Sequence, residues 1–179
     1  MKSTLLSTLL ILFLGLPASA YPQFTTLNAP SSNAPSPVET KLTAPDAELD
    51  DQFGRAVAVQ GNVAVVGAPN DQAAGYGTGA AYVFEKTTSG WQLQQKLTAL
   101  DGSSYSFFGT SVAVDGDRIV VGAYGDQNAG IYAGAAYVFV RAGSQWTAEQ
   151  KLTGSENSVA DSFGISVAIQ RSLALPNIR

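Results

Sequence analysis

Two aspartates, Asp71 and Asp126, hold corresponding places in two glycine-rich stretches of the chain. They are the only carboxylates kept in register within those stretches. A loop aspartate can accept backbone N–H groups in an Asx-turn, or it can join its counterparts in a row that faces a ligand. The spacing favours the turn and leaves the second role open, so both residues are candidates for binding through a loop.

A denser group of carboxylates precedes the first Phe-Gly pair. It does not recur intact, because the second copy of this segment keeps only Asp101 and the third has Glu156 and Asp161. A metal site or a catalytic pair needs carboxylates at fixed places, whereas a run of charge on a loop is usually solvated. We interpret the group as a solvated acidic loop made of Asp46, Glu48, Asp50 and Asp51.

Two further motifs have a chemical and a structural interpretation. The glycines at 75, 77 and 79 resemble a phosphate-cradling loop, but strand-type residues follow and no helix N-terminus is expected there. The segment therefore favours a plain flexible loop. Trp91 and Trp146 could stack on carbohydrate, but their place in an alternating strand favours packing in the core.

The composition excludes several classes of site. The 179 residues include no His and no Cys, and 10 Lys+Arg against 14 Asp+Glu give a net charge of −4. Disulfides, thiolate zinc sites, a Cys nucleophile and a Ser-His-Asp triad are thus ruled out. The mild negative charge argues against binding to nucleic acid or anionic lipid.

One class of enzyme remains compatible with this composition. A glycoside hydrolase can work with two carboxylates alone, but they must converge in a pocket, and no suitable pair recurs along the chain. We expect a non-catalytic protein with no catalytic or cofactor-binding residues, and keep the carboxylate-based hydrolase as the less favoured alternative.

These residues are positioned by a repeat of 55 residues. Lys41-Leu42-Thr43 recurs at 96–98 and 151–153, and the hexamer at 79–84 recurs intact at 134–139. Aligned without gaps, 41–95 and 96–150 are identical at about half of their positions. The repeat is therefore the organising feature of the chain.

Each unit is predicted to form four strands. Gly54 to Val59 and Val63 to Gly67 are apolar runs joined by Gln60-Gly61-Asn62, a hairpin signal that becomes Asp115-Gly116-Asp117 in the next unit. The third strand carries Ala-Tyr-Val-Phe, and the fourth runs from Trp91 to Thr98.

The pattern of these strands predicts how they are covered. The first three are near-continuously apolar, so we expect both of their faces to be buried. The fourth alternates, with Trp91, Leu93 and Leu97 expected on one face and the polar residues, Lys96 among them, on the other. The prediction is an all-β fold of β-propeller-type blades with four antiparallel strands, comprising two complete repeats and partial flanking ones.

The recurring pieces resemble the FG-GAP repeats of integrin alpha-chain β-propellers and their bacterial and eukaryotic relatives. The resemblance implies a propeller-type fold that serves mostly in extracellular binding or adhesion, stabilised by calcium in some members. It rests on Phe53, Gly54, Val66, Gly67, Ala68, Pro69, Phe108, Gly109, Val121, Gly122, Ala123, Phe163 and Gly164.

The calcium site of that family is not carried over. Its ligands occupy a long acidic loop between the first two strands, because Ca²⁺ takes six to eight oxygen ligands. Here the connections at 60–62 and 115–118 are tight turns, too short to wrap an ion. We expect no cofactor, with calcium left as the only candidate metal.

The segments outside the complete repeats suggest export. Residues 1–20 have the charge, apolar stretch and Ala18-Ser19-Ala20 pattern of a signal peptide cleaved after Ala20, and no later segment could span a membrane. Residues 21–37 read as a Pro/Ser-rich linker. We expect a secreted protein, extracellular or periplasmic.

The C-terminal part departs from the pattern. The repeat region covers 38–170, with units at about 41–95 and 96–150 and a partial one at 151–170, and residues 171–179 no longer match. We expect a binding module for a protein or glycan, with a truncated remnant of a longer propeller as the alternative. Open sheet edges would also favour self-association.

Overall fold

The structure is a computed structural model that describes residues 39–72, 74–155 and 159–170. The chain divides into the units Met1–Val38 and Glu39–Arg179, and every described residue belongs to the second unit. The predicted signal peptide, the linker and the segment 171–179 lie outside the described residues. No described residue belongs to a helix with the length and apolarity to cross a membrane.

The first sheet contains the four strands of the first repeat. They are β1 (Ala56–Gln60), β2 (Val63–Ala68), β3 (Ala80–Thr87) and β4 (Gly90–Leu97). Each strand pairs antiparallel with the next, which gives the order β1-β2-β3-β4. The first and third connections are two-residue turns, and Gly61 within the first turn and Gly90 at the start of β4 adopt the positive φ that tight hairpins favour.

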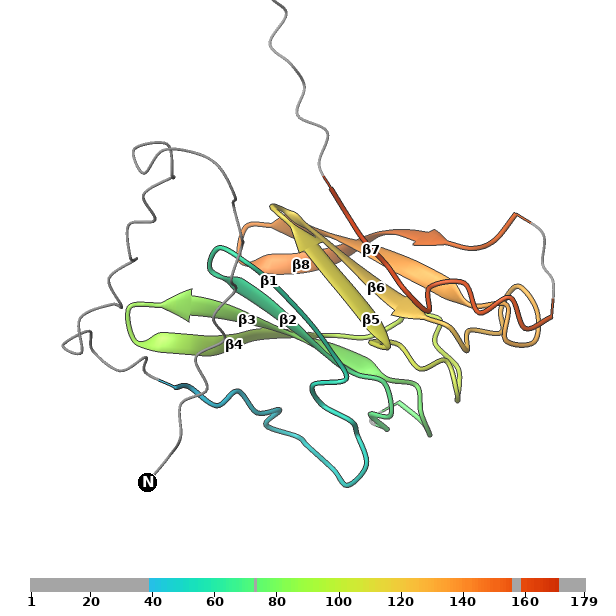
Figure 1. Cartoon of the computed structure of the whole chain (residues 1–179), viewed down its shortest axis with the longest axis horizontal. Coiled ribbons are helices and arrows are strands. Elements are labelled where there is room, and N and C mark those ends of the chain that lie inside the picture. Colours follow the sequence, from blue (N-terminus) through green and yellow to red (C-terminus); the bar gives the residue numbers. More distant parts are fainter. Residues whose placement is uncertain (1–38, 73, 156–158, 171–179) are drawn as a thin grey trace, which may run out of the picture. The chain divides into compact units, whose positions relative to one another are not determined.

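The second sheet repeats this arrangement. Its strands are β5 (Ser111–Asp115), β6 (Arg118–Ala123), β7 (Ala135–Ala142) and β8 (Gln145–Leu152), in the order β5-β6-β7-β8 (Figure 1). Every regular element among the described residues is a strand, and neither sheet closes on itself. The predicted all-β class and the four-stranded antiparallel blades are confirmed.

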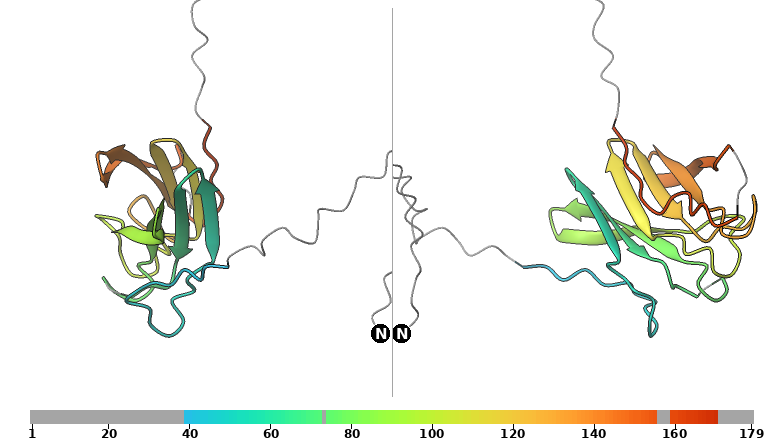
Figure 2. Two further views of the ribbon diagram at one scale, coloured as in Figure 1. Left: turned by 90° about the vertical axis from the view of Figure 1, so that its left-hand side faces the viewer. Right: turned by 45° about the vertical axis from the view of Figure 1, so that its right-hand side comes forward.

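The two sheets pack face to face. Strand β5 lies against β1 and β2 (Figure 2), and β8 contacts β4. The core between them includes Val65 and Val83 from the first sheet, Val121 and Tyr137 from the second, and the fully buried Phe108. The opposite face of the first sheet is covered in part by the preceding segment, with Leu42, Ala44 and Phe53 in contact.

The recurrent Phe-Gly and Val-Gly-Ala motifs meet where successive repeats join. Within the second repeat, Gly109 donates its N–H to the carbonyl of Gly122 at an N···O distance of 3.0 Å. A Cβ on Gly67 would lie 1.9 Å from the carbonyl oxygen of Gly109, so only glycine fits there. In the third copy, Gly164 approaches Gly122 in the same way. The motifs recur because each repeat has to pack closely on the next.

Two sequence predictions about strand faces were wrong. The first strand is not covered on both faces, since Val57 and Val59 of β1 are 59% and 60% exposed. These valines pair with Val66 and Ala64, and no sheet among the described residues packs on that face of β1. Both first strands, β1 and β5, are thus less buried than their apolar sequences indicate.

The second error concerns the fourth strand. Phe84 pairs with Leu93 but Val83 pairs with Gln95, so Gln94 is an extra residue in a β-bulge. After the bulge the alternation is reversed, and Leu97 turns into the core between the sheets while Lys96 shares a face with Tyr82. Strand β8 has a bulge at the equivalent place.

Candidate functional site

Each complete repeat contains the same polar cluster, which has one buried and one half-exposed aspartate and which we call the Asp-Tyr-Lys cluster. Its two carboxylates come from two loops, one before the first strand and one between the second and third strands. Its tyrosine lies on the third strand and its lysine on the fourth. The members are Asp46, Asp71, Tyr82 and Lys96 in the first repeat, and Asp101, Asp126, Tyr137 and Lys151 in the second.

The contacts of the first cluster are short. The hydroxyl oxygen of Tyr82 lies 2.8 Å from Asp46 Oδ1 and 2.7 Å from Asp71 Oδ2. The Lys96 ammonium lies 2.7 Å from an oxygen of each carboxylate and 5.2 Å from the centre of the Tyr82 ring. One cation and one hydroxyl thus bridge the two aspartates.

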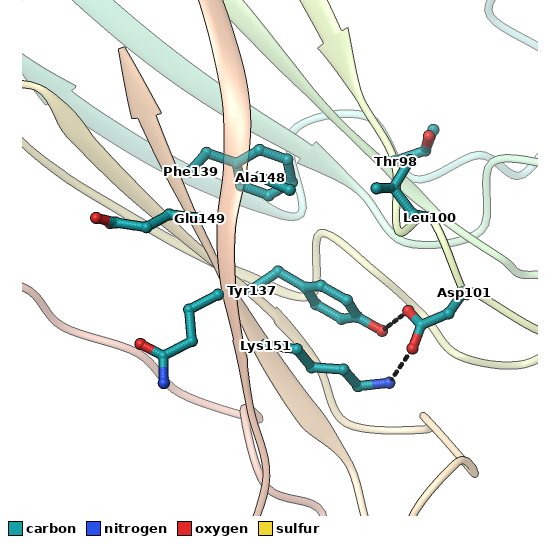
Figure 3. A pocket seen from close by; sticks show the side chains of 9 residues that line it. Thr98, Leu100, Asp101, Tyr137, Phe139, Ala148, Glu149 and Lys151 are labelled. Atoms are coloured by element: carbon teal, nitrogen blue, oxygen red, sulfur yellow. Dashed lines mark hydrogen bonds and ion pairs between the residues drawn. The ribbon is translucent and has the colours of Figure 1, made fainter. Parts of the chain in front are cut away.

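The second cluster reproduces this geometry. The Tyr137 hydroxyl is 2.8 Å from Asp101 and 2.7 Å from Asp126, and Lys151 reaches the same two residues at 2.7 and 2.9 Å. Tyr137 and Lys151 both point at Asp101 beside a cavity of about 240 Å³, with Leu100 on its wall (Figure 3). The equivalence of the two clusters makes them part of the repeat's architecture.

The bulge in the fourth strand is what completes each cluster. Tyr82 and Lys96 are directly paired across β3 and β4 only because the register shifts by one residue after Val83. Without that shift Lys96 would point to the other face of the sheet. Pairing of Tyr137 with Lys151 depends on the equivalent shift in the second sheet.

The surroundings fix the charge states of the cluster. Hydrogen bonding from Lys96 holds the pKa of Asp46 below its usual 3.8, although burial opposes it. Burial also opposes ionisation of Asp101, but hydrogen bonds from Lys151 and Tyr137 outweigh it and the pKa again lies below 3.8. Burial, reinforced by hydrogen bonds to the carboxylates, raises the pKa of Tyr82 above its usual 10.0. None of these three groups is poised to exchange a proton near neutral pH.

The structure places the two predicted loop aspartates inside the molecule. Asp71 is 3% exposed and Asp126 is 0% exposed. Asp126 also accepts the backbone N–H of Asn128 at 3.0 Å, which is the Asx-turn geometry. Both carboxylates therefore tie a loop to the sheet and do not face solvent.

The acidic loop is exposed at Asp46, Glu48 and Asp50, as predicted, but not at Asp51. Asp46 is also held by Tyr82 and Lys96, and Asp101 holds the equivalent place in the second repeat. Asp51 is only 5% exposed, and its Oδ2 accepts the N–H of Glu48. The signal that was missed is that Asp46 and Asp101 are 55 residues apart and thus in register.

The structure also locates the glycine-rich loop and the two tryptophans that the sequence singled out. Gly77 and Gly79 lie in a loop that pairs with the Phe-Gly segment of the next repeat, through the bridge between Gly79 and Phe108. Trp146 is 2% exposed and packs in the core between the sheets, and Trp91 packs against the apolar cluster on the opposite face. No group of three or more His, Cys, Asp or Glu side chains within the described ranges is arranged to hold a metal ion.

A second feature lies on the loops that connect β2 to β3, β4 to β5, and β6 to β7, which we call the loop face. Four aromatic rings form a continuous row there: Tyr76, Tyr105, Phe107 and Tyr124. Successive ring centroids are 5.3, 6.2 and 5.1 Å apart, and the last two rings are stacked with an interplanar angle of 7°. Tyr76 is 60% exposed and Tyr105 is 45% exposed.

A polar cavity of about 420 Å³ adjoins this aromatic row. Phe107 and Tyr124 form part of its wall, and Gln52, Arg55 and Asn70 supply polar groups. Sequence reasoning missed the row, because its aromatic residues do not recur at the equivalent positions of the other repeats. The sequence did contain a signal, because these aromatic residues occupy loop positions at which the other repeats have non-aromatic residues.

Comparison with known proteins identifies one family, whose sequence model matches the chain twice. The sequence model of the FG-GAP repeat matches the chain at residues 38–84 and 91–139. These two matches begin 53 residues apart, and each ends in the third strand of a sheet, after the recurrent Ala-Tyr-Val-Phe. No curated protein matches the chain.

Proposed function

Because the chain belongs to the FG-GAP repeat family, we propose that it is a non-catalytic, exported repeat module that binds a protein or glycan partner through its loop face. Its place of action is at or outside the cell surface, in an extracellular or periplasmic compartment. The observation that carries this proposal is the exposed aromatic row beside a polar cavity. Protein surfaces that expose aromatic rings next to polar groups are typical of binding sites.

The non-catalytic character is supported by the state of the carboxylates. The best-placed pair in each repeat, such as Asp101 with Asp126, is already bridged by a lysine and a tyrosine. A glycoside hydrolase needs one carboxyl held neutral to donate a proton and another free to attack or to activate water. The ammonium of Lys151 opposes such a neutral state by favouring ionised oxygens.

Export is supported by the sequence of residues 1–20 and by the lack of cysteine, which leaves no thiol to oxidise outside the cell. The partner we propose is neither nucleic acid nor a membrane, given the net charge of −4. No calcium requirement is proposed, because the turns at 61–62 and 116–117 connect adjacent strands directly. The melting temperature should then be the same in calcium and in EDTA.

Binding is tested with the full chain, expressed with its own N-terminal segment in a secreting host. Mass spectrometry of the exported product should show Tyr21 as its first residue. The product is then screened against immobilised extracellular proteins and against a glycan array. Saturable binding that is weakened by Tyr76→Ala supports the proposal.

Three outcomes would count against it. Retention of the uncleaved chain inside the cell would overturn the export proposal. A cooperatively folded protein that binds nothing in either screen would overturn the binding role, and an exported chain without a cooperative unfolding transition would favour the alternative of a remnant without independent function.

A second candidate role, self-association, is favoured by one observation. Val57 and Val59 form an exposed apolar row on β1, the edge strand of the first sheet. The equivalent valines of β5, Val112 and Val114, are partly buried because they pack on the first sheet. We propose that a second copy of the chain covers the row on β1.

A further inference from the structure

We propose that the aromatic row and the adjoining cavity form a binding site for an acidic saccharide. One sugar ring stacks on the exposed rings of Tyr76 and Tyr105, and a neighbouring uronic acid unit places its carboxylate in the cavity near Arg55. This inference rests on the proposed binding function and names its ligand class and its site.

The backbone at this site is unfavourable for the residues it carries. Tyr105 and Phe107 have φ values of 65° and 54°, in the left-handed region that bulky side chains rarely adopt. The equivalent loop positions of the first repeat, Asp50 and Gln52, have nearly the same φ. The repeat thus imposes the conformation, and only the middle copy places aromatic rings on it.

The neighbouring positions differ between repeats in a coordinated way. The second repeat has Tyr124 and Gly125 where the first has Pro69 and Asn70. A Cβ on Gly125 would lie 2.0 Å from the carbonyl oxygen of Tyr105 and 2.8 Å from Cδ2 of Phe107, so only glycine lets the two loops approach this closely. These changes build one continuous aromatic surface at a single place in the fold.

The surface has the chemistry of a sugar-binding site. The C–H faces of a pyranose ring are apolar and stack on aromatic rings, while its hydroxyls need polar partners close by. Tyr76 and Tyr105 are both exposed, and each combines an aromatic ring with a hydroxyl. Gln52, Asn70 and Thr110 place amide and hydroxyl groups along the cavity wall. A purely apolar partner would leave these polar groups unpaired.

The charge at the cavity selects the kind of sugar. Arg55 is the only Lys, Arg, Asp or Glu among the residues that line it. Arg55 is exposed and forms no ion pair with any of the described residues. A guanidinium binds a carboxylate through two parallel hydrogen bonds, which favours a uronic acid over a neutral sugar.

The test is a calorimetric titration of the full chain with oligogalacturonate. A neutral cello-oligosaccharide is titrated in the same way for comparison. We expect saturable binding of oligogalacturonate that is at least about tenfold tighter than binding of the neutral chain. Tyr105→Ala should lower the affinity for both chains by about tenfold. Arg55→Gln should remove the preference for the acidic chain and leave the weaker binding of the neutral one.

Tyr132→Ala is the matched control. Tyr132 is also a partly exposed loop tyrosine with a positive φ, 53°, but it has no ring contact with the aromatic row. Its substitution should leave both affinities unchanged. Thermal melting of each variant verifies that it is folded.

Three results would overturn the inference. The first is a folded wild-type chain that binds neither saccharide, and the second is equal loss of affinity in the Tyr105→Ala and Tyr132→Ala variants. The third is unchanged acidic preference in Arg55→Gln. If the chain binds an extracellular protein through Tyr76 but no saccharide, the inference fails while the proposed binding function stands.

Discussion

The phenylalanine of the Phe-Gly motif offers the sharpest test of how the repeats are stabilised. Its copies Phe53, Phe108 and Phe163 are equivalent in the sequence pattern, but the structure gives them different surroundings. Phe108 is 0% exposed between the two sheets, Phe53 is partly buried, and Phe163 is 37% exposed. Truncation of each to alanine should therefore destabilise the protein by different amounts.

The size of each effect follows from the contacts that are lost. Truncating a fully buried Phe to Ala costs about 3–5 kcal/mol. Phe108 makes edge-to-face contacts with Tyr137 and Phe139 at ring-centroid distances of 5.4 and 6.0 Å, and Phe53 makes equivalent contacts in the first repeat, so burial is what separates the two. We expect a loss at the upper end of that range for Phe108→Ala. We expect about 2–3 kcal/mol for Phe53→Ala and about 1 kcal/mol for Phe163→Ala, because less of each ring is buried.

The assay is urea unfolding of the full chain followed by the fluorescence of Trp91 and Trp146, with the midpoint and slope fitted for each variant. Small domains are stable by only about 5–15 kcal/mol, so Phe108→Ala could leave little folded protein. The milder pair Phe108→Leu and Phe53→Leu keeps the comparison measurable, with losses of about 1.5 and 0.5 kcal/mol. Equal losses at the two positions, or a greater loss at Phe53, would refute the reasoning that the contact between sheets dominates.

Three further predictions concern other parts of the fold. Gly109→Ala should cost about 2 kcal/mol more than Gly54→Ala, because both glycines have a positive φ but a Cβ meets a backbone oxygen at 2.2 Å only at Gly109. Equal losses by urea unfolding would contradict this. Lys151→Met should lower the free energy of unfolding by about 3 kcal/mol at neutral pH, because it leaves the fully buried carboxylate of Asp126 without its cation. A loss below about 1 kcal/mol would argue against the bridging role of Lys151. Val57→Asp should abolish any concentration-dependent dimer seen by sedimentation, whereas Leu49→Asp, at a 90% exposed position, should not; equal effects would argue against the row on β1 as the contact.

The pH dependence of stability should follow the cluster carboxylates. The folded-state pKa values of Asp46 and Asp101 lie below 3.8, so their contribution is present above pH 3.8 and is lost as the pH falls through the folded values. Tyr82 and Lys96 have raised pKa values, so their contribution is complete below pH 10.0 and is lost at higher pH. Thermal melting should show a plateau between these limits. A steep change in the melting temperature near pH 7 would contradict the assignment.

Much of the fold could be predicted from the sequence because a repeat carries redundant information. The turn at Gly61 and its counterpart at Gly116 marked the same hairpin twice, and the structure has both. The recurrence of Phe-Gly and Val-Gly-Ala identified the family, and their contact at Gly109 and Gly122 explains why the spacing is kept. Local pattern was sufficient for these features, because hairpins and strands are set by residues close together in the chain.

The candidate sites could not be predicted in the same way. Alternation in the fourth strand predicted Lys96 and Leu97 on the wrong faces, because a single bulged residue at Gln94 reverses the alternation without a mark in the sequence. The role of Asp46 depends on a loop that reaches a lysine 50 residues further along.

The sequence by itself determined the repeat and the four strands of each unit, because these depend on short-range geometry and on periodicity. Only the tertiary structure decided which face each side chain of the fourth strand occupies and which carboxylates are buried. It also brought the aromatic rings at 76, 105, 107 and 124 into one row. The physical reason is that these features arise from register and from packing of one sheet on the next, where a shift of one residue exchanges the inside for the outside.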